Sequence, residues 1–255
     1  MPQHGIYYPD DKVFVVVEGN DPGRSCSAEG KGMNSIKVDK LPTIRRLPEY
    51  LRILRNLACH GKGVVSSGRL AEAMNIDPIL VRKDLAMTGI EGTPRLGYKI
   101  PDLIAAIEEL LGWGDASMDA FLVGVGHLGT AILGYQELSE SGHRILAAFD
   151  KDPEKIGLTV HGIRVSGLDE LPELVSRMKV HVAILTVPPG NAQEAADFLA
   201  KSGIQGIWNF TTVSLEVPEG VVTHKEDLMA GLAVLSVKLA RVTGRPLGRL
   251  NLKRK

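Results

Sequence analysis

A glycine-rich loop and the acid that follows it form the most specific chemical pattern in this sequence. The loop Gly124-Val125-Gly126-His127-Leu128-Gly129 has the spacing G-x-G-x-x-G and follows the apolar run Ala120–Val123. Between a strand and a helix, such a loop lets the backbone approach a pyrophosphate, which then rests on the helix N-terminus. Asp150 follows the next apolar run, the predicted strand Ile145–Phe149, and lies 21 residues after Gly129, where a carboxylate can bind the hydroxyls of an adenosine ribose. The pattern predicts a dinucleotide site and favours NAD over NADP.

Two later apolar runs are predicted to complete this site. Val180–Thr186 and Gly206–Asn209 are expected to be buried strands, with helices over Thr130–Leu138 and Ala192–Ala200. The alternation predicts an α/β fold, a Rossmann domain with a doubly wound parallel sheet over residues 117–222. Ligands bind at the carboxyl ends of such strands. The predicted nicotinamide neighbours are therefore Val187, Pro188, Asn209 and Phe210.

Asp150 and His127 each also have a structural interpretation. Asp150-Lys151-Asp152-Pro153 is also typical of a turn, and this is compatible with the ligand role that we favour for Asp150. His127 is interpreted as a spacer lining the phosphates rather than as a catalyst. A hydride-transfer enzyme needs a substrate domain and an acid or base near the nicotinamide, and the sequence leaves no room for the first. We therefore predict no catalytic residue, no metal site and no enzyme.

Residues 40–112 have the pattern of a winged helix-turn-helix. Apolar residues recur at helical spacing from Leu47 to Leu57, and Ser66-Ser67 supplies an N-cap for Gly68–Met74. Pro78 begins a third helix that extends to about Met87. A Gly- and Pro-rich loop, a short strand at Tyr98–Ile100 and a helix over residues 101–112 follow.

The charge distribution supports a role on DNA. The whole chain has 30 basic and 30 acidic residues, and a net charge of zero alone would argue against DNA binding. The segment from Lys40 to Lys99, however, contains eleven basic and five acidic residues. Its net charge is therefore +6, and that of the remainder is −6. Such a basic module binds phosphates with release of counterions.

Two cations lie near the middle of the predicted recognition helix. Arg82 and Lys83 can reach guanine edges or phosphates there, and Arg95 in the wing loop can enter a minor groove. Alternatively, these cations are only the solvated face of a helix. The turn before them and the loop after them favour DNA. The predicted DNA-binding residues are Arg45, Arg46, Ser66, Ser67, Arg82, Lys83 and Arg95.

The two ends of the chain differ in character. Residues 225–243 predict a helix with a wide apolar face that needs a partner, followed by a basic tail at 244–255. Residues 1–36 have the composition of a disordered extension. Glu29-Gly30-Lys31-Gly32 precedes Met33 and implies purine-rich codons like those of a ribosome-binding site, so Met33 is the alternative start.

Overall composition indicates a reducing compartment. Two cysteines, Cys26 and Cys59, cannot build a disulfide framework, and no apolar run approaches the length of a membrane span. We therefore expect a cytoplasmic protein without a membrane partner.

Several collinear stretches together resemble the Rex family of bacterial redox-sensing transcriptional repressors. The resemblance covers about residues 40–243. The matching stretches are LPTIRRLPEYLRIL, VSSGRLAEAMNI, VRKDL, LVGVGHLGTAILGY, AAFDKDPEKIG, AILTVP, AQEAADFLAKSGIQGIWNF, LEVPEGV and EDLMAGLAVLS. It implies a homodimer with swapped C-terminal helices, which binds a palindromic operator and releases it when NADH binds, so that it reads the NADH/NAD⁺ ratio.

The resemblance also implies residue roles. Arg82 and Lys83 match DNA contacts, Gly124 to Gly129 the pyrophosphate loop, and Asp150 the ribose acid. A trio that couples the two ligands corresponds to Arg52, Tyr135 and Asp227. The wing departs from the family, because its aromatic residues are absent and its basic residue is displaced to Arg95, which leaves the operator sequence open. Two other functions remain as alternatives: an NAD-dependent oxidoreductase with a basic N-terminal module, and a CoA-binding protein of the ligase type.

Overall fold

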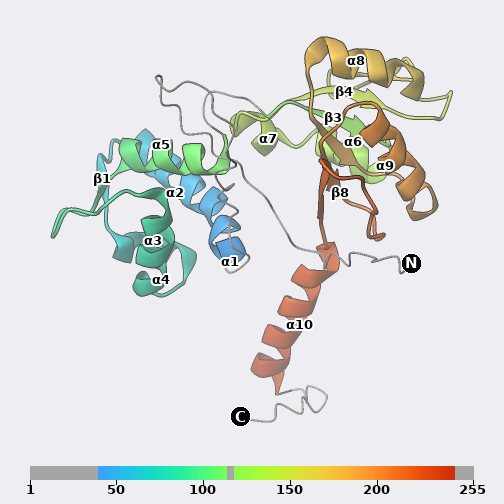
Figure 1. The fold of residues 1–255 in the computed structure, drawn as a ribbon. Coiled ribbons are helices and arrows are strands. Elements are labelled where there is room, and N and C mark those ends of the chain that lie inside the picture. Colours follow the sequence, from blue (N-terminus) through green and yellow to red (C-terminus); the bar gives the residue numbers. More distant parts are fainter. Residues whose placement is uncertain (1–39, 114–117, 245–255) are drawn as a thin grey trace, which may run out of the picture. The chain divides into compact units, whose positions relative to one another are not determined.

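The structure, a computed structural model, describes residues 40–113 and 118–244. These residues form two compact units that divide after Ser117, each with its own buried core (Figure 1). The extension at 1–36 with the alternative start at Met33, and the tail beyond Gly244, lie outside the described residues.

The first unit is a small helical module with a two-stranded wing. Strands β1 and β2 pair antiparallel, with Val64 opposite Lys99. The first helix, which has a single turn, was not predicted because four residues carry no apolar repeat. In chain order the elements are α1 (Leu41–Ile44), α2 (Leu47–Cys59), β1 (Val64–Val65), α3 (Ser67–Met74), α4 (Pro78–Leu85), the 3₁₀ turn η2 (Ala86–Thr88), β2 (Tyr98–Lys99) and α5 (Ile100–Leu111).

Local signals fix the ends of α3 and α4. The Ser66 hydroxyl accepts a hydrogen bond from the Arg69 N–H, which confirms Ser66 as the predicted N-cap of α3. The Asp77 carboxylate accepts one from the Ile79 N–H, and Pro78 fits the first turn of α4. The unit is held by buried residues from every longer helix, namely Leu47, Tyr50, Leu51, Leu54, Leu70, Val81, Leu85, Ile100, Leu103 and Ile107.

The second unit is the predicted Rossmann-type domain. Of the strands expected, Ala120–Val123, Ile145–Phe149 and Gly206–Asn209 have the predicted bounds. Its elements are β3 (Ala120–Val123), α6 (His127–Leu133), α7 (Gln136–Glu140), β4 (Ile145–Phe149), β5 (Thr159–Val160), β6 (Ile163–Ser166), η3 (Leu168–Glu170), α8 (Leu171–Met178), β7 (Val182–Leu185), η4 (Pro189–Asn191), α9 (Ala192–Lys201), β8 (Gly206–Asn209), β9 (Val222–Lys225) and α10 (Leu228–Thr243).

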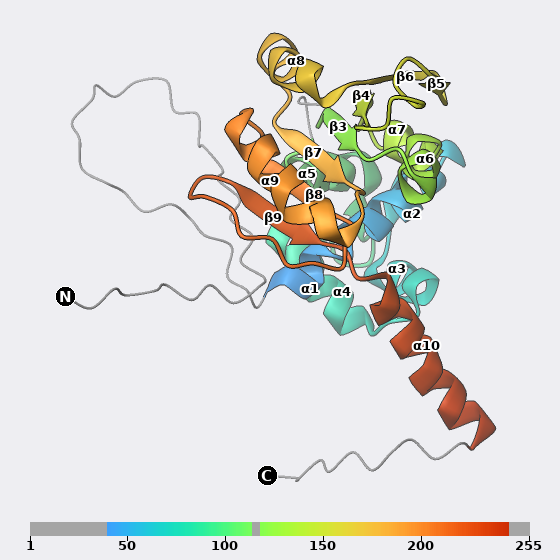
Figure 2. The same ribbon diagram turned by 90° about the vertical axis from the view of Figure 1, so that its right-hand side faces the viewer.

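The strands form one seven-stranded sheet in the order β5-β6-β4-β3-β7-β8-β9 (Figure 2). All neighbours pair parallel except β5 and β6, which form an antiparallel hairpin. Helices α8 and α9 pack on the face that carries Phe121, whereas α6 packs on the face that carries Leu122. The direction of winding reverses at β3, and the carboxyl end of that strand is where such a sheet binds its ligand.

Several elements of the second unit differ from the prediction. The helix expected over Thr130–Leu138 is interrupted at Gly134-Tyr135, which separates α6 from α7. The His161 ring lies against Gly134 so closely that a Cβ there would be 2.8 Å from ring atoms, and Tyr135 is extended. The β5–β6 hairpin and the exposed strand β9 were not predicted, because short or solvent-facing strands lack an apolar pattern.

Helix α10 is unusual for its exposed surface. The apolar face was predicted, and in the structure eight large apolar side chains on this helix lie exposed: Leu228, Met229, Leu232, Val234, Leu235, Val237, Leu239 and Val242.

Candidate nucleotide site and nucleic-acid interface

The three glycines of the loop after β3 have different surroundings, which explain why glycine occupies each position. Gly124 has a φ of 102°, and a Cβ there would lie 2.9 Å from the backbone of Thr186 and Val187. At Gly129 a Cβ would lie 2.1 Å from the Gly124 carbonyl oxygen. At Gly126, the N-cap of α6, a Cβ would meet no protein atom within 4 Å. The outer glycines are therefore required by the fold, while the middle one borders space that a ligand can fill.

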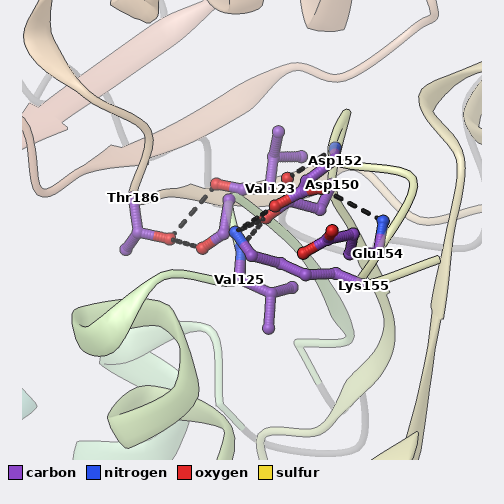
Figure 3. A network of polar contacts seen from close by, with 8 residues as sticks. Val123, Val125, Asp150, Asp152, Glu154, Lys155 and Thr186 are labelled. Atoms are coloured by element: carbon purple, nitrogen blue, oxygen red, sulfur yellow. Dashed lines mark hydrogen bonds and ion pairs between the residues drawn. The ribbon is translucent and has the colours of Figure 1, made fainter. Parts of the chain in front are cut away.

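The Asp150 carboxylate supports the loop from β4. Its Oδ2 accepts a hydrogen bond of 2.8 Å from the Val125 N–H, and its Oδ1 accepts one of 3.0 Å from the Asp152 N–H. The Lys155 ammonium lies 3.0 Å from Oδ2 (Figure 3). Although burial acts to raise it, the pKa of Asp150 is lowered by these three donors. Asp150 is thus ionised beside the loop. It both forms a turn with Asp152 and lies at the position predicted for the ribose acid.

Thr186 joins the loop to the neighbouring strand. Its hydroxyl lies 2.7 Å from the Gly124 carbonyl oxygen and 3.1 Å from that of Val123 (Figure 3). Neither Thr186 nor Lys155 was predicted. Lys155 could have been found, because it lies only five residues after Asp150 in the same turn. Nothing in the sequence indicates the contact of Thr186 with the loop.

The other predicted cofactor residues lie at the same edge of the sheet. Val123 pairs with Leu185, and Leu185 with Asn209, so the loops after β3, β7 and β8 begin side by side. The buried Asn209 amide, however, is used within its own loop, where it donates to the Val213 carbonyl and accepts from the Thr211 N–H. The Phe210 ring packs on Trp208, with centroids 4.7 Å apart. Val187 and Pro188 come after β7 and Thr186, so their backbone lies near this edge of the sheet.

In the first unit, α4 separates its side chains clearly by face. Arg82 and Lys83 are exposed, while Val81, Asp84 and Leu85 are buried. Asp84 is 1% exposed and accepts from the Arg46 Nε and Nη2, each at 2.7 Å, from the Thr43 hydroxyl at 2.8 Å and from the Tyr50 hydroxyl at 2.9 Å. These contacts fix α4 to α1 and α2 and present its two cations outward.

The cluster of Thr43, Arg46 and Tyr50 around Asp84, here called the Asp84 cluster, gives Arg46 a structural role that was not predicted. Both of its contacting nitrogens are bound to a buried carboxylate, in the fork geometry of a strong ion pair. Burial acts to raise the pKa of Asp84, but the hydrogen bonds from Arg46, Thr43 and Tyr50 lower it. Burial, followed by the Asp84 contact, raises the pKa of Tyr50. Arg46 is therefore a scaffold residue of this unit, unlike the exposed Arg45.

The wing ends in a tight turn that carries Arg95. Thr93 and Gly97 exchange two backbone hydrogen bonds of 2.8 Å, and Arg95 between them has a φ of 65°. The arginine is exposed at this tip. Ser66 and Ser67 lie at the start of α3, with the Ser66 side chain engaged as the cap. The predicted basic residues are thus distributed over α4, the wing and the segment before α2.

The three predicted coupling residues each have a local partner. Arg52 binds Glu49 one turn earlier, at 2.5 Å and 3.0 Å, and the Tyr135 hydroxyl donates to Glu137. Asp227 is the N-cap of α10 and accepts from the Met229 N–H at 2.9 Å. Arg52 and Tyr135 are both largely exposed, so their side chains are accessible to other partners.

Two kinds of feature are absent from residues 40–113 and 118–244. No group of three or more His, Cys, Asp or Glu side chains there is arranged to hold a metal ion. None of the helices described there has the length and apolar character needed to cross a membrane.

Comparison with known proteins agrees with both units. Residues 41–86 match the family described as "Putative DNA-binding protein N-terminus", and residues 115–213 match the "CoA binding domain" family. The chain is similar to the redox-sensing transcriptional repressor Rex of Treponema denticola, with 46% identity over 80% of this chain and 96% of that protein. For Rex of Bacteroides fragilis the identity is 40%, over 81% and 93% of the two chains.

Solved structures give the same result. The crystal structure of RSP in complex with β-NAD⁺ and operator DNA has a TM-score of 0.71 at 31% identity, covering 81% of this chain and 98% of RSP. RSP in complex with β-NADH has a TM-score of 0.70 at 32% identity, covering 80% and 95%. RSP is described as a Rex-family repressor.

Proposed function

This chain belongs to the Rex family of redox-sensing transcriptional repressors, and we propose how its residues divide the work of sensing and repression. The glycine loop and Asp150 bind NAD⁺ or NADH, the first unit binds operator DNA, and NADH binding releases the operator. The protein thereby reads the NADH/NAD⁺ ratio.

The observation that carries the nucleotide assignment is the open space at Gly126 beside an ionised Asp150. A pyrophosphate needs a backbone without Cβ at that point and a helix N-terminus beneath it, and α6 begins at His127. Asp150 accepts hydroxyl donors of a ribose. The nicotinamide would lie toward Val187, Pro188 and Phe210, while Asn209 shapes its own loop. The cofactor supplies the redox state, and these residues only bind and orient it.

The DNA contact is assigned to the exposed cations of the first unit. Arg82 and Lys83 on α4 would reach base edges and phosphates in the major groove, and Arg95 would enter the minor groove from the wing. Arg45 and the α3 terminus at Ser66 and Ser67 would contact phosphates. Arg46 contributes indirectly, by holding α4 through Asp84.

We assign the transmission of the signal to Arg52, Tyr135 and Asp227 in a homodimer. The exposed apolar face of α10 supports a second copy as its partner. Arg52 and Tyr135 have exposed local partners, Glu49 and Glu137, whose contacts are weak enough to exchange. In this proposal the three residues form one set of charge-assisted contacts with NADH bound and another on a palindromic operator.

The alternative enzymatic functions have less support. An oxidoreductase needs an acid or base beside the nicotinamide, and at this sheet edge the buried Asn209 amide is bound within its own loop. A CoA-binding protein of the ligase type has no use for a ribose acid at Asp150 or for a basic helical module. We therefore regard the protein as a regulator without catalytic activity, acting in the cytoplasm where chromosomal DNA lies.

The decisive experiment is a gel shift of the full chain on DNA from upstream of its own gene, with NADH, NAD⁺ or no cofactor. Binding that NADH abolishes and NAD⁺ does not would support the proposal. Binding that is insensitive to NADH would reject the sensor function.

A further inference from the structure

Lys155 lies at the position where a nucleotide site distinguishes its two common cofactors. NAD(H) and NADP(H) differ only at the adenosine ribose, where NADP(H) has a 2′-phosphate. The Lys155 ammonium is 3.0 Å from the Asp150 carboxylate that is proposed to bind this ribose, and 3.7 Å from the Asp152 carboxylate (Figure 3). The lysine side chain is 36% exposed, so the ammonium is both paired and accessible.

Asp150 and Lys155 would have opposite electrostatic effects on a bound 2′-phosphate. A carboxylate repels the phosphate, whereas an ammonium would form a charge-assisted contact with it. In the structure the ammonium contacts two carboxylates, and its hydrogen bond to Asp150 raises the pKa of Lys155, which keeps the side chain charged. Lys151, also exposed and in the same turn, has no contact with Asp150 among those described.

We propose, on the basis of the function given above, that Lys155 is a latent receptor for a 2′-phosphate and that Asp150 suppresses it. The preference for NADH over NADPH then rests on one ion pair. The site excludes NADPH through a carboxylate that both repels the phosphate and occupies the cation that would bind it.

The test compares NADH and NADPH binding in four proteins: the wild-type chain, Asp150→Asn, Asp150→Asn/Lys155→Met and Asp150→Asn/Lys151→Met. Asparagine keeps an acceptor for the Val125 N–H but carries no charge. Titrations of dinucleotide fluorescence give both dissociation constants, and cofactor-free operator binding shows that each variant is folded. Asp150→Ala serves in the same scheme if the asparagine variant fails that check.

We expect Asp150→Asn to shift the preference toward NADPH by about tenfold or more, the size of one charge-assisted contact. Adding Lys155→Met should remove most of this gain, whereas adding Lys151→Met should leave it. An NADPH gain that survives Lys155→Met, or no gain in Asp150→Asn, would overturn the inference. A wild-type chain that binds neither dinucleotide would instead overturn the proposed function itself.

Discussion

The two units of this protein each bury an aspartate against a basic side chain, with opposite consequences. Asp84 is 1% exposed, and its four hydrogen bonds come from three side chains of its own unit. Asp150 is 8% exposed, and its donors are two backbone N–H groups and a lysine that remains accessible to solvent.

The difference teaches how a buried carboxylate can be assigned. A carboxylate whose acceptor positions are filled by inward-facing side chains has no capacity left for a ligand, and its role is to position an element. A carboxylate that depends on a partly exposed ammonium can exchange that donor for another. The same residue type therefore supports α4, the proposed recognition helix, in one unit and contributes to the proposed nucleotide site in the other.

The largest effect is expected from Asp84→Ala, which would remove the acceptor at the centre of the Asp84 cluster. Arg46 and Tyr50 would lose their acceptor in a buried place, at a cost of about 3–5 kcal/mol in unfolding free energy. Operator binding should be lost, because α4 is no longer fixed to α1 and α2. Urea unfolding followed by circular dichroism, together with a gel shift, measures both.

The nucleotide site provides the control for Asp84→Ala. Its NADH dissociation constant should remain within about threefold of the wild type, because the two units have separate cores. A comparable loss of NADH binding would show that the Asp84 cluster acts beyond its own unit.

Gly126→Ala should weaken NADH binding and leave the stability of the fold almost unchanged. The added methyl meets no protein atom and the φ is −89°, so unfolding free energy should change by less than about 1 kcal/mol. The methyl enters the space assigned to the pyrophosphate, and NADH affinity should fall at least about tenfold. The variant should still bind operator but respond poorly to NADH in a gel shift. Unchanged NADH affinity would contradict the site.

The pH dependence of unfolding should distinguish the wild-type Asp84 cluster from the Asp84→Asn variant. The pKa of Asp84 is lowered in the folded state, so near its unfolded value of about 4 the unfolded chain binds more protons. The stability that Asp84 provides is present at neutral pH and is lost as pH falls below about 4 and through the folded pKa. Urea titrations from pH 7 to pH 3 should show a shallower decline for Asp84→Asn, and parallel curves would contradict the prediction.

The smallest effects are expected at the exposed pairs. Glu49→Gln and Glu137→Gln remove the local partners of Arg52 and Tyr135 at a cost within about 1 kcal/mol. If these partners compete with the coupling contacts, the NADH concentration that releases half of the operator should shift by less than about fivefold. Glu173→Gln, which breaks the exposed Arg177 pair on α8, is the control and should cause no shift. Identical release curves in all three variants would remove Glu49 and Glu137 from the coupling.

Sequence patterns predicted the parts of this molecule that depend on local chemistry. Strong apolar runs bounded by turns fixed the strands at Ala120–Val123 and Ile145–Phe149. The glycine spacing located the loop, because its first and third glycines are dictated by backbone contacts within that motif. The cap at Ser66 likewise depends on a backbone N–H only three residues away.

Features created by distant contacts were missed. Asp84 sits in the sequence Arg-Lys-Asp and its burial depends on Thr43, Arg46 and Tyr50, about 34 to 41 positions earlier. The close contact that requires a glycine at position 134 comes from His161, in a hairpin that had no apolar signal of its own. Arg46 was grouped with the DNA contacts because its charge is visible in the sequence and its partner is not.

Helix α10 links the proposed dimer to the concentration of the protein. A 16-residue helix that exposes eight large apolar side chains is marginal as an isolated helix in water. If a second copy covers it, as proposed, helix formation and association become one equilibrium, and the unfolding midpoint rises with protein concentration by mass action. The abundance of the repressor, in addition to the redox state, would then determine the fraction that is competent to bind its operator.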